Sequence, residues 1–388
     1  MNLPRAEATA ETGGGGSSGS GAPDRPLRVA VDARTTAGNR AGIGVYTACL
    51  LDALEALEEP GLEVVRFGAG GDWHMRTPQR WLWDQWHVPS HVRRLGPSVL
   101  HCPGYSAPLG SPCPVVLTVH DLIPSLFPGD FSWPSWFYYT RWMPFTFRFA
   151  AAIITISEAS RHDLLRLTRV PAERIEVIPL AAAPAYRPPP DAAALEAALA
   201  RLGVRCPYVL GVSSIEPRKN FPMLVEAFEL CRRRAGLPAQ LTLVIAGSKD
   251  WGLATVQKAC RGADLERSVT LTGYVSGDDL VALYQGAELF VFPSAYEGFG
   301  LPVLEAMACG TPVVASSVSS IPEVAGDACV LVPQPLTAER FAESMAAVLT
   351  DPGARADLGR RGLARAGRFS WRETARRTVG VYRRVARG

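Results

Sequence analysis

The sequence predicts an α/β fold with two doubly wound parallel sheets, one in each half of the chain. From residue 27 onward, short apolar runs alternate with segments of helical periodicity, which is typical of parallel sheets covered by helices on both faces. The alternation is interrupted once, between residues 181 and 206, by a proline cluster and an alanine-rich helical pattern, and then starts again. The length of 388 residues also exceeds what one hydrophobic core usually serves.

The first half follows a Gly/Ser-rich segment, residues 1–26, whose composition predicts a disordered tail. The run LRVAVDAR, residues 27–34, is the first expected strand, and a glycine-bearing turn leads from it to the helical pattern GIGVYTACLLDALEALE. Further strand-like runs lie at 63–67, 98–102, 114–120, 151–157 and 175–181. We therefore expect residues 27–183 to form a first domain.

The second half begins with the connection at residue 184 and restarts the alternation at YVLGVSS, residues 208–214. Strand-like runs follow at 241–248, 269–275, 289–294, 311–316 and 329–333. We expect residues 184–370 to form a second domain, and residues 371–388 an arginine-rich helix for which a return to the first domain is left open. Two such sheets place a cleft between the carboxyl ends of their strands, where ligands bind in open α/β sheets.

The composition excludes several classes of protein. A formal net charge of +3 lacks the strong basic excess of a dedicated nucleic-acid binder. The eight cysteines form no Cys-x-x-Cys pair and lie partly in apolar runs, so we expect reduced thiols in a cytoplasmic protein. The sequence contains no run of 18 apolar residues, so we expect no membrane span. No apolar core of signal-peptide length occurs near the start.

The turn VSSIEPRKN, residues 212–220, carries Arg218 and Lys219 between a strand and a helix. Free backbone N–H groups and the helix dipole favour an anion at such a place. Arginine offers a planar fork and lysine a point charge, which together suit a diphosphate. The alternative is a solvated basic turn that only caps a helix.

The stretch LFVFPSAYEGFGLPVLEAMACG, residues 289–310, reads as strand, loop and helix, with Pro302 in the first helical turn and Gly310 past the end. Glu297 lies in the loop and Glu305 in or near the first turn. Carboxylates accept hydrogen bonds from paired hydroxyls, so two acids here fit a polyhydroxyl ligand. The alternative is a solvated loop acid at Glu297 and a favourable helix-terminal charge at Glu305.

These two motifs together resemble the retaining glycosyltransferases of family 4, which have the GT-B fold of two Rossmann-like domains facing across a cleft. The resemblance extends over residues 27–388. It implies that Glu297 contacts the donor sugar near its reacting end, that Glu305 binds the nucleotide ribose, and that Arg218 and Lys219 hold the diphosphate. It also implies donor contacts along the neighbouring turns, at Ser214, Gly298, Phe299, Gly300 and Leu301.

The first half contains two further matches to this family. AGIGVYT, residues 41–47, resembles the loop with which Gly42 and Gly44 would face the acceptor and the donor phosphates; the alternative is a plain helix-entry turn. LTVHD, residues 117–121, brings His120 and Asp121 to a strand end, where the family's histidine contacts the donor sugar; the alternative is a structural histidine. In the second half, Tyr274 and Val275 resemble the loop that covers the base.

The resemblance implies a retaining hexosyltransferase that uses Glu297, His120, Arg218 and Lys219 in catalysis. We expect a nucleotide diphospho-sugar donor, with GDP-mannose favoured and UDP-glucose and UDP-N-acetylglucosamine open, and a glycan or lipid-linked acceptor in surface polysaccharide assembly. No Asp-x-Asp occurs, so we expect neither metal nor cofactor, with Arg218 and Lys219 in the metal's electrostatic role. The alternatives are a nucleotide-sugar epimerase, a sugar phosphorylase, or a non-catalytic binding protein on the same fold.

The segment FSWPSWFYYTRWMPFTFRFAAA, residues 131–152, carries ten aromatic side chains and few charges. We expect a helix packed on the first sheet, with an exposed part near the acceptor side. Aromatic and arginine side chains also suit a membrane interface. The sequence therefore leaves open a peripheral position on the inner face of the cell membrane.

Overall fold

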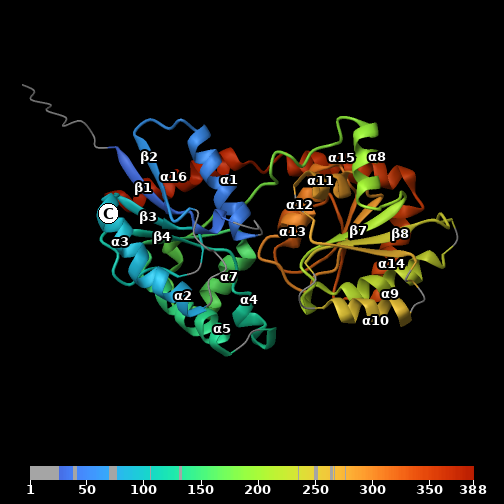
Figure 1. Ribbon diagram of the computed structural model, residues 1–388, viewed down its shortest axis with the longest axis horizontal. Helices are drawn as coiled ribbons and strands as arrows, with labels where there is room; N and C mark the ends of the chain where they lie inside the picture. The colour runs from blue at the N-terminus through green and yellow to red at the C-terminus, as the bar shows by residue number, and fades with distance from the viewer. Residues whose placement is uncertain are drawn as a thin grey trace, which may run out of the picture.

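The computed structural model describes residues 26–37, 42–69, 77–104, 106–130, 133–234, 236–248, 252–262, 265, 267–275 and 277–388. These residues form two lobes, which lie side by side in Figure 1. Each lobe is built on one sheet that has six strands within the described residues. The predicted pair of doubly wound parallel sheets is therefore confirmed. The Gly/Ser-rich tail predicted for residues 1–26 lies, except for Pro26, outside the described residues.

The first lobe contains β1 (Leu27–Asp32), β2 (Leu62–Phe67), β3 (Val99–Cys102), β4 (Val115–Val119), β5 (Ala152–Thr155) and β6 (Ile175–Val177). Their order is β2-β1-β3-β4-β5-β6, and all pairs are parallel. Val29 of β1 is in register with Val64 on one side and Val99 on the other. Every residue of β3, β4 and β5 is buried, as expected for strands covered on both faces.

Helices α1 (Ile43–Ala56), α2 (Thr77–Leu82), α3 (Val88–Leu95), α4 (Ile123–Leu126) and α7 (Glu158–Leu167) belong to this lobe. α1 begins after Gly42, whose φ of +49° lies in the left-handed region that favours glycine. α7 begins at a serine cap, because the Ser157 hydroxyl accepts a hydrogen bond from the amide of Ser160.

The aromatic segment is helical from residue 133, and its first two residues lie outside the described part. It consists of α5 (Trp133–Phe137), a π-helical turn (Tyr138–Trp142), α6 (Met143–Thr146) and a 3-10 turn (Phe147–Phe149), so the expected helix is interrupted. Tyr138 and Phe147 are buried, whereas the Trp133 side chain is 73% exposed. Among the described residues, no helix has the length and apolar character needed to cross a membrane.

The second lobe contains β7 (Tyr208–Val212), β8 (Thr242–Ala246), β9 (Val269–Gly273), β10 (Leu289–Phe292), β11 (Val313–Ser316) and β12 (Val330–Val332). Their order is β12-β11-β10-β7-β8-β9, all parallel. The strand order reverses between β7 and β10, and ligands bind beyond the carboxyl ends of such a pair. The loops that follow β7 and β10 carry the two motifs of the second half.

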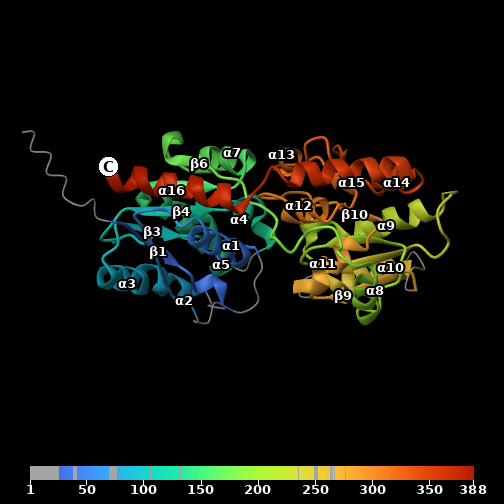
Figure 2. The ribbon, with the colours of Figure 1, turned by 90° about the horizontal axis from the view of Figure 1, so that it is seen from above.

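The helices of the second half are α8 (Ala192–Arg201), α9 (Phe221–Arg232), α10 (Leu253–Gly262), α11 (Gly277–Gln285), α12 (Leu301–Ala308), α13 (Ile321–Ala325), α14 (Ala338–Leu349), α15 (Pro352–Ala366) and α16 (Trp371–Arg387). Figures 1 and 2 show that α16 leaves the second lobe and lies along the first, beside α1. The domain boundaries at residues 183 and 370 stay predictions.

Helix α16 is fixed to the first sheet by a buried hydrogen-bond chain. The Tyr382 hydroxyl lies 2.6 Å from Nδ1 of His101, and Nε2 of His101 lies 2.9 Å from the hydroxyl of Thr118. Burial lowers the pKa of His101 to about 3, so the imidazole is neutral and has one donor and one acceptor nitrogen. Each ring nitrogen therefore needs its own partner.

We predict that Tyr382→Phe lowers the free energy of unfolding by about 1–3 kcal/mol, because it leaves one buried nitrogen of His101 without a partner. Chemical denaturation measures the change. Arg376→Gln on the exposed face of the same helix should leave the denaturation midpoint unchanged, because within the described residues its ion pair is with Glu373 alone. A Tyr382→Phe variant as stable as the wild type would contradict the assigned role of this hydrogen bond.

Candidate active site

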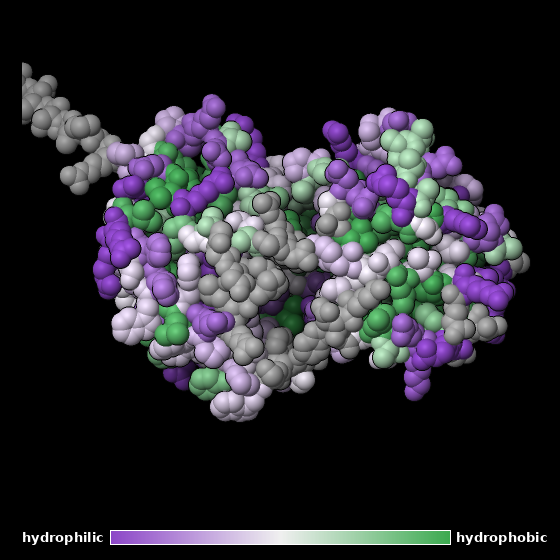
Figure 3. Space-filling model, viewed as in Figure 1, coloured by the Kyte–Doolittle hydropathy of each residue, from purple (hydrophilic) through white to green (hydrophobic). Residues whose placement is uncertain are grey.

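A cavity of about 940 Å³ lies between the two lobes at the carboxyl ends of their strands. The hollow between the lobes is visible in Figure 3. His120 and Asp121 of the first lobe line it, opposite Lys219, Glu297 and Glu305 of the second, so the structure brings together most of the site residues predicted from the sequence. Its volume is within the usual range for sites that hold small molecules.

At the centre of the second-lobe wall, Lys219 and Glu297 form a buried ion pair. Nζ of Lys219 lies 2.5 Å from Oε1 of Glu297, and the two residues are 6% and 8% exposed. Lys219 ends the turn after β7, and Glu297 lies in the loop after β10. Because β7 and β10 are neighbours at the point where the strand order reverses, the loops meet there although 78 residues separate the two side chains.

Arg218 lies beside this pair but takes a different position. Its Nη2 pairs with Glu216 at 2.8 Å, its Nη1 donates to the carbonyl of Tyr296 at 3.2 Å, and Glu297 is 3.7 Å away. Among the described residues, Lys219 lines the cavity and Arg218 does not. The two cations predicted to hold one diphosphate therefore do not face the cavity equally in this structure.

The loop from Gly298 to Leu301 presents its backbone to the cavity. Gly300 caps α12 with a φ of +97°, and Pro302 stands in the first turn, as the sequence predicts. Within the described residues, the amides of Phe299, Gly300 and Leu301 donate no hydrogen bond. Three N–H groups at a helix N-terminus provide donors for an anionic or hydroxylated ligand.

Glu305 is the fifth residue of α12, so it lies beyond the first turn, which contains no acid. The interpretation of Glu305 as a helix-terminal charge is therefore not supported by its position. Its Oε2 accepts a hydrogen bond from the Tyr284 hydroxyl at 3.0 Å. Burial raises the pKa of Glu305 to about 7, and hydrogen bonds from Tyr284 and Tyr186 oppose this rise.

On the first-lobe wall, His120 packs edge-on against Tyr46, with 4.7 Å between ring centroids, and its Nε2 lies 2.8 Å from the carbonyl of Pro103. Burial lowers the pKa of His120 to about 4. The neutral ring must therefore carry its proton on Nε2 to donate to this carbonyl, which leaves Nδ1 as an acceptor. Burial raises the pKa of the neighbouring Asp121.

The remaining predicted residues are divided between the cavity and the interior. Gly42 lines the cavity, whereas Gly44 is buried inside α1 and does not. The expectation that both glycines face the ligand is therefore wrong for Gly44, and for Gly42 it stays a prediction. Ser214, Tyr274 and Val275 line the cavity, and the Tyr274 side chain is 45% exposed. The Ser214 hydroxyl donates to Glu216 at 2.7 Å.

Sequence reasoning missed several residues of this cavity. Tyr186 of the interdomain connection lines it, and Tyr284 of α11 is buried; both are partners of Glu305. Gly247 after β8 also lines the cavity, and it must be glycine because an added Cβ would lie 1.7 Å from the Ser213 carbonyl oxygen. The glycine near the end of the predicted strand run 241–248 was the available signal for Gly247.

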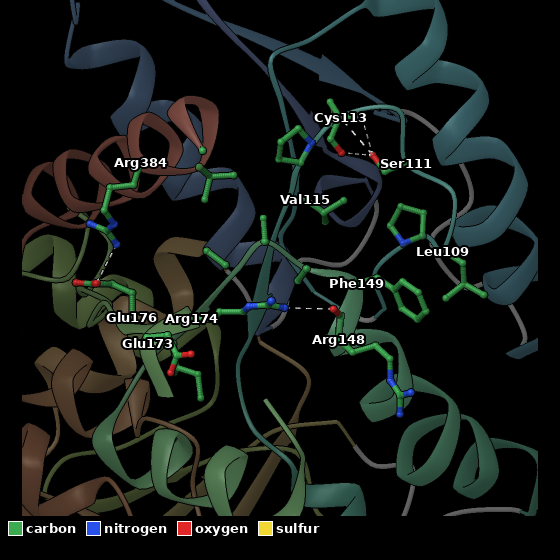
Figure 4. A pocket seen from close by; sticks show the side chains of 18 residues that line it. Leu109, Ser111, Cys113, Val115, Arg148, Phe149, Glu173, Arg174, Glu176 and Arg384 are labelled. Carbon is green, nitrogen blue, oxygen red and sulfur yellow. Dashed lines mark hydrogen bonds and ion pairs between the residues drawn. The ribbon is translucent and has the colours of Figure 1, made fainter. Parts of the chain in front are cut away.

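A second cavity, of about 550 Å³, lies at the opposite edge of the first sheet, near the amino ends of β4, β5 and β6 (Figure 4). Two of its charged side chains have polar partners: Arg384 pairs with Glu176 at 3.0 Å, and Arg174 donates to the carbonyl of Arg148 at 3.4 Å. None of the site residues predicted from the sequence lines it. The cleft between the lobes is therefore the candidate site.

Over the part of the chain that the structure describes, no group of three His, Cys, Asp or Glu side chains has a metal-binding arrangement. The expected independence of metals and cofactors stays a prediction.

We predict that Lys219→Met lowers the free energy of unfolding by up to about 3–5 kcal/mol, because Glu297 then stays buried and its remaining cationic neighbour among the described residues, Arg218, is 3.7 Å away. Chemical denaturation of a double-mutant cycle measures the coupling. Lys219→Met/Glu297→Gln should recover most of the loss, because neither charge remains buried alone. Equal stability of the single variant and the wild type would show that the pair contributes nothing.

In a comparison with known proteins, each half of the chain matches a family model. The family model described as Glycosyl transferases group 1 matches residues 203–365, and Glycosyltransferase Family 4 matches residues 35–186. O-antigen chain mannosyltransferase B of Escherichia coli is 36% identical over 234 residues, which cover 60% of this chain and 61% of that protein. The serotype-specific mannosyltransferase WbdA of Escherichia coli is 31% identical over 285 residues, 71% of this chain and 34% of WbdA. The chain thus spans less than two thirds of either relative.

Solved structures show the same architecture. Sucrose-phosphate synthase from Thermosynechococcus elongatus superposes with a TM-score of 0.71 at 22% identity, over 92% of this chain and 98% of that chain. WaaG, a glycosyltransferase involved in lipopolysaccharide biosynthesis, superposes with a TM-score of 0.69 at 14% identity, over 92% and 99%. These are GT-B structures, so the predicted GT-B fold is confirmed. With family models matching both lobes, the chain belongs to the group 1, or family 4, glycosyltransferases.

Proposed function

We propose that this protein is a retaining, metal-independent hexosyltransferase that acts in surface polysaccharide assembly. It would transfer a hexose from a nucleotide diphospho-sugar to a glycan or lipid-linked acceptor. The observation that carries this proposal is the buried Lys219–Glu297 pair, which faces a cleft of about 940 Å³ at the reversal point of the second sheet. A cation for phosphate and a carboxylate for sugar hydroxyls stand side by side there.

The favoured donor is GDP-mannose. Two relatives with at least 31% identity carry names of mannosyltransferases, one of them of the O-antigen chain. These names support mannose as the sugar but leave the base open. HepE from Anabaena was solved with UDP and glucose, and at 20% identity its likeness concerns the fold alone. UDP-linked sugars therefore stay the alternative.

Donor binding would begin with an exchange of partners at Lys219. Its ammonium is held by Glu297, so an incoming diphosphate must displace this carboxylate. The amides of Phe299, Gly300 and Leu301 supply further donors to phosphate or sugar, and the released carboxylate of Glu297 can accept hydrogen bonds from sugar hydroxyls. Binding would thus convert a neutral buried pair into two separate contacts with the donor.

The transfer itself would break the bond between the anomeric carbon and the phosphate oxygen, with oxocarbenium character at the carbon. The acceptor hydroxyl forms the new bond from the same face, and its proton goes to the leaving phosphate. Lys219 and Arg218 stabilise the charge that develops on that phosphate. Neutral His120 can accept a hydrogen bond from a sugar hydroxyl at Nδ1, since its Nε2 is engaged by Pro103.

A panel of donors tests the proposal. GDP-mannose, UDP-glucose, UDP-galactose and UDP-N-acetylglucosamine are incubated with the protein and a chelator, and nucleotide release is measured with and without glycan acceptors. We expect one donor to be turned over with the chelator present, and Glu297→Gln to lower the rate strongly. Turnover without nucleotide release would indicate an epimerase, and a requirement for inorganic phosphate a phosphorylase. No turnover of any donor would overturn the proposal.

We predict that affinity for the donor's free nucleotide rises about tenfold between pH 6 and pH 8, as Glu305 loses its proton around pH 7. The ionised carboxylate accepts hydrogen bonds from ribose hydroxyls more strongly, so the raised pKa weakens binding below pH 7. Titration calorimetry measures the affinity. The phosphate of the nucleotide titrates in the same way with Glu305→Gln, but this variant lacks the carboxyl group. Its affinity for the nucleotide should therefore not show the tenfold rise.

We also propose a peripheral position on the inner face of the cell membrane, through an aromatic ladder formed by Trp81, Trp142, Phe145 and Phe149. Successive ring centroids lie 5.9, 5.8 and 5.7 Å apart. Phe145 and Phe149 are 39% and 42% exposed, and Arg148 lies over the Phe145 ring. Between residues 131 and 152 the only charged side chains are two arginines, which suits an anionic lipid surface.

We predict that Phe145→Ser/Phe149→Ser lowers partition onto vesicles that contain anionic lipid, because it removes two exposed rings from this surface. Sedimentation with the vesicles measures the partition. Leu363→Ser, which removes an exposed apolar side chain of similar exposure from the second lobe, is the matched control. Equal partition of the ladder variant and the wild type would contradict the membrane contact.

A further inference from the structure

The backbone at Glu297 and Gly298 is held by serine hydroxyls from both lobes. Within the second lobe, the amide of Glu297 donates to the hydroxyl of Ser319 at 2.9 Å, and the hydroxyl of Ser320 donates to the carbonyl of Glu297 at 2.9 Å. These two bonds fix one side of the peptide. They do not by themselves determine where Glu297 lies relative to the first lobe.

The other two serines come from α7 of the first lobe and its cap. The hydroxyls of Ser157 and Ser160 donate to the carbonyl of Gly298 at 2.7 and 3.2 Å. The Ser160 hydroxyl also lies 2.9 Å from the carbonyl of His120. Because the hydroxyl has one hydrogen, the carbonyls of His120 and Gly298, one from each lobe, share it. Ser157 and Ser160 are 2% and 1% exposed, so water competes little for these bonds.

Further contacts bind α7 to the second lobe. The carboxylate of Glu323 accepts hydrogen bonds from the amides of Glu158 and Ala159, both at 2.8 Å, and Tyr296 donates to Asp163. There is also no room for a side chain at Gly298. An added Cβ would lie 2.9 Å from the carbonyl oxygen of His120. The loop that carries Glu297 thus touches the first lobe at the residue next to it.

We propose that Ser157 and Ser160 are positioning residues that hold the Glu297–Gly300 loop against His120. Neither is assigned a contact with the donor. They act through the Gly298 carbonyl, so that Glu297 and His120 address the same sugar from the two lobes. This inference rests on the proposed function, because it concerns the geometry of that reaction. It implies that closure of the lobes and placement of Glu297 are one event.

The two roles of Ser157 can be separated by substitution. It caps α7 by accepting from the amide of Ser160 at 3.0 Å, and it donates to Gly298. Ser157→Thr keeps both roles. Ser157→Asp keeps the cap, because a carboxylate accepts hydrogen bonds, but at pH 8 it cannot donate. Ser157→Ala loses both roles. Thr337→Ala removes a similar cap from α14, away from the cleft, and is the control for lost capping.

The experiment measures kcat, the affinity for the free nucleotide of the donor and the melting temperature of each variant. We expect wild-type kcat for Ser157→Thr and Thr337→Ala, and a fall of about five- to fiftyfold for Ser157→Asp and Ser157→Ala. Nucleotide affinity should stay within about twofold, because Glu305 and the base-covering loop belong to the second lobe. Small-angle scattering should show lobes further apart in the two slow variants.

Wild-type kcat for Ser157→Asp would overturn the inference and leave capping as the only role. If Ser157→Asp fails to fold, Ser160→Ala replaces it, because it removes a hydroxyl without touching the cap acceptor. A parallel loss of kcat and nucleotide affinity would also contradict a positioning role. Failure of the proposed function has a different signature, since the wild-type protein itself would then transfer no sugar.

Discussion

The buried ion pair between Lys219 and Glu297 determines how the second lobe presents its site. A buried charge is tolerated only when a partner compensates it, so the turn after β7 and the loop after β10 must meet at one point. Hydrogen bonds reinforce this meeting, from the Ala295 amide to the Arg218 carbonyl and from the Asn220 side chain to the Pro293 carbonyl. The reversal of strand order between β7 and β10 makes the meeting possible.

Acidic groups around the cleft outnumber the two cations of the site. Glu216 and Glu297 pair with Arg218 and Lys219, and Asp121 and Glu305 also line the cleft. A diphosphate therefore enters only if some of this negative charge moves or is neutralised. In the proposed function Glu297 moves from Lys219 to the sugar, and Glu305, with its pKa raised to about 7, exchanges a proton near neutral pH. The contact of Gly298 with the first lobe restricts where Glu297 can move.

The sequence was informative about strands and motifs and less so about side-chain partners. The expected strand runs all coincide with observed strands. The inner strands, such as β3, β4 and β5, are mostly apolar because they are buried on both faces. The carboxyl-end turns with Arg218, Lys219 and Glu297 also followed from the pattern. The Lys219–Glu297 contact did not, since it depends on the order of strands in the sheet. Tyr186, Ser157 and Ser160 are single polar residues without a pattern, and the burial of Gly44 depends on the rotation of α1.

Calorimetric titration tests the displacement of Glu297 from Lys219 most directly. The protein is titrated with a nucleoside, its monophosphate and its diphosphate, all with the base of the active donor. The proteins compared are the wild type and Lys219→Met/Glu297→Gln, which removes the pair without leaving a buried charge alone. Our account predicts that the wild type prefers the diphosphate, and that the double variant loses this preference while its affinity for the nucleoside is unchanged. An undiminished diphosphate preference in the double variant would contradict it.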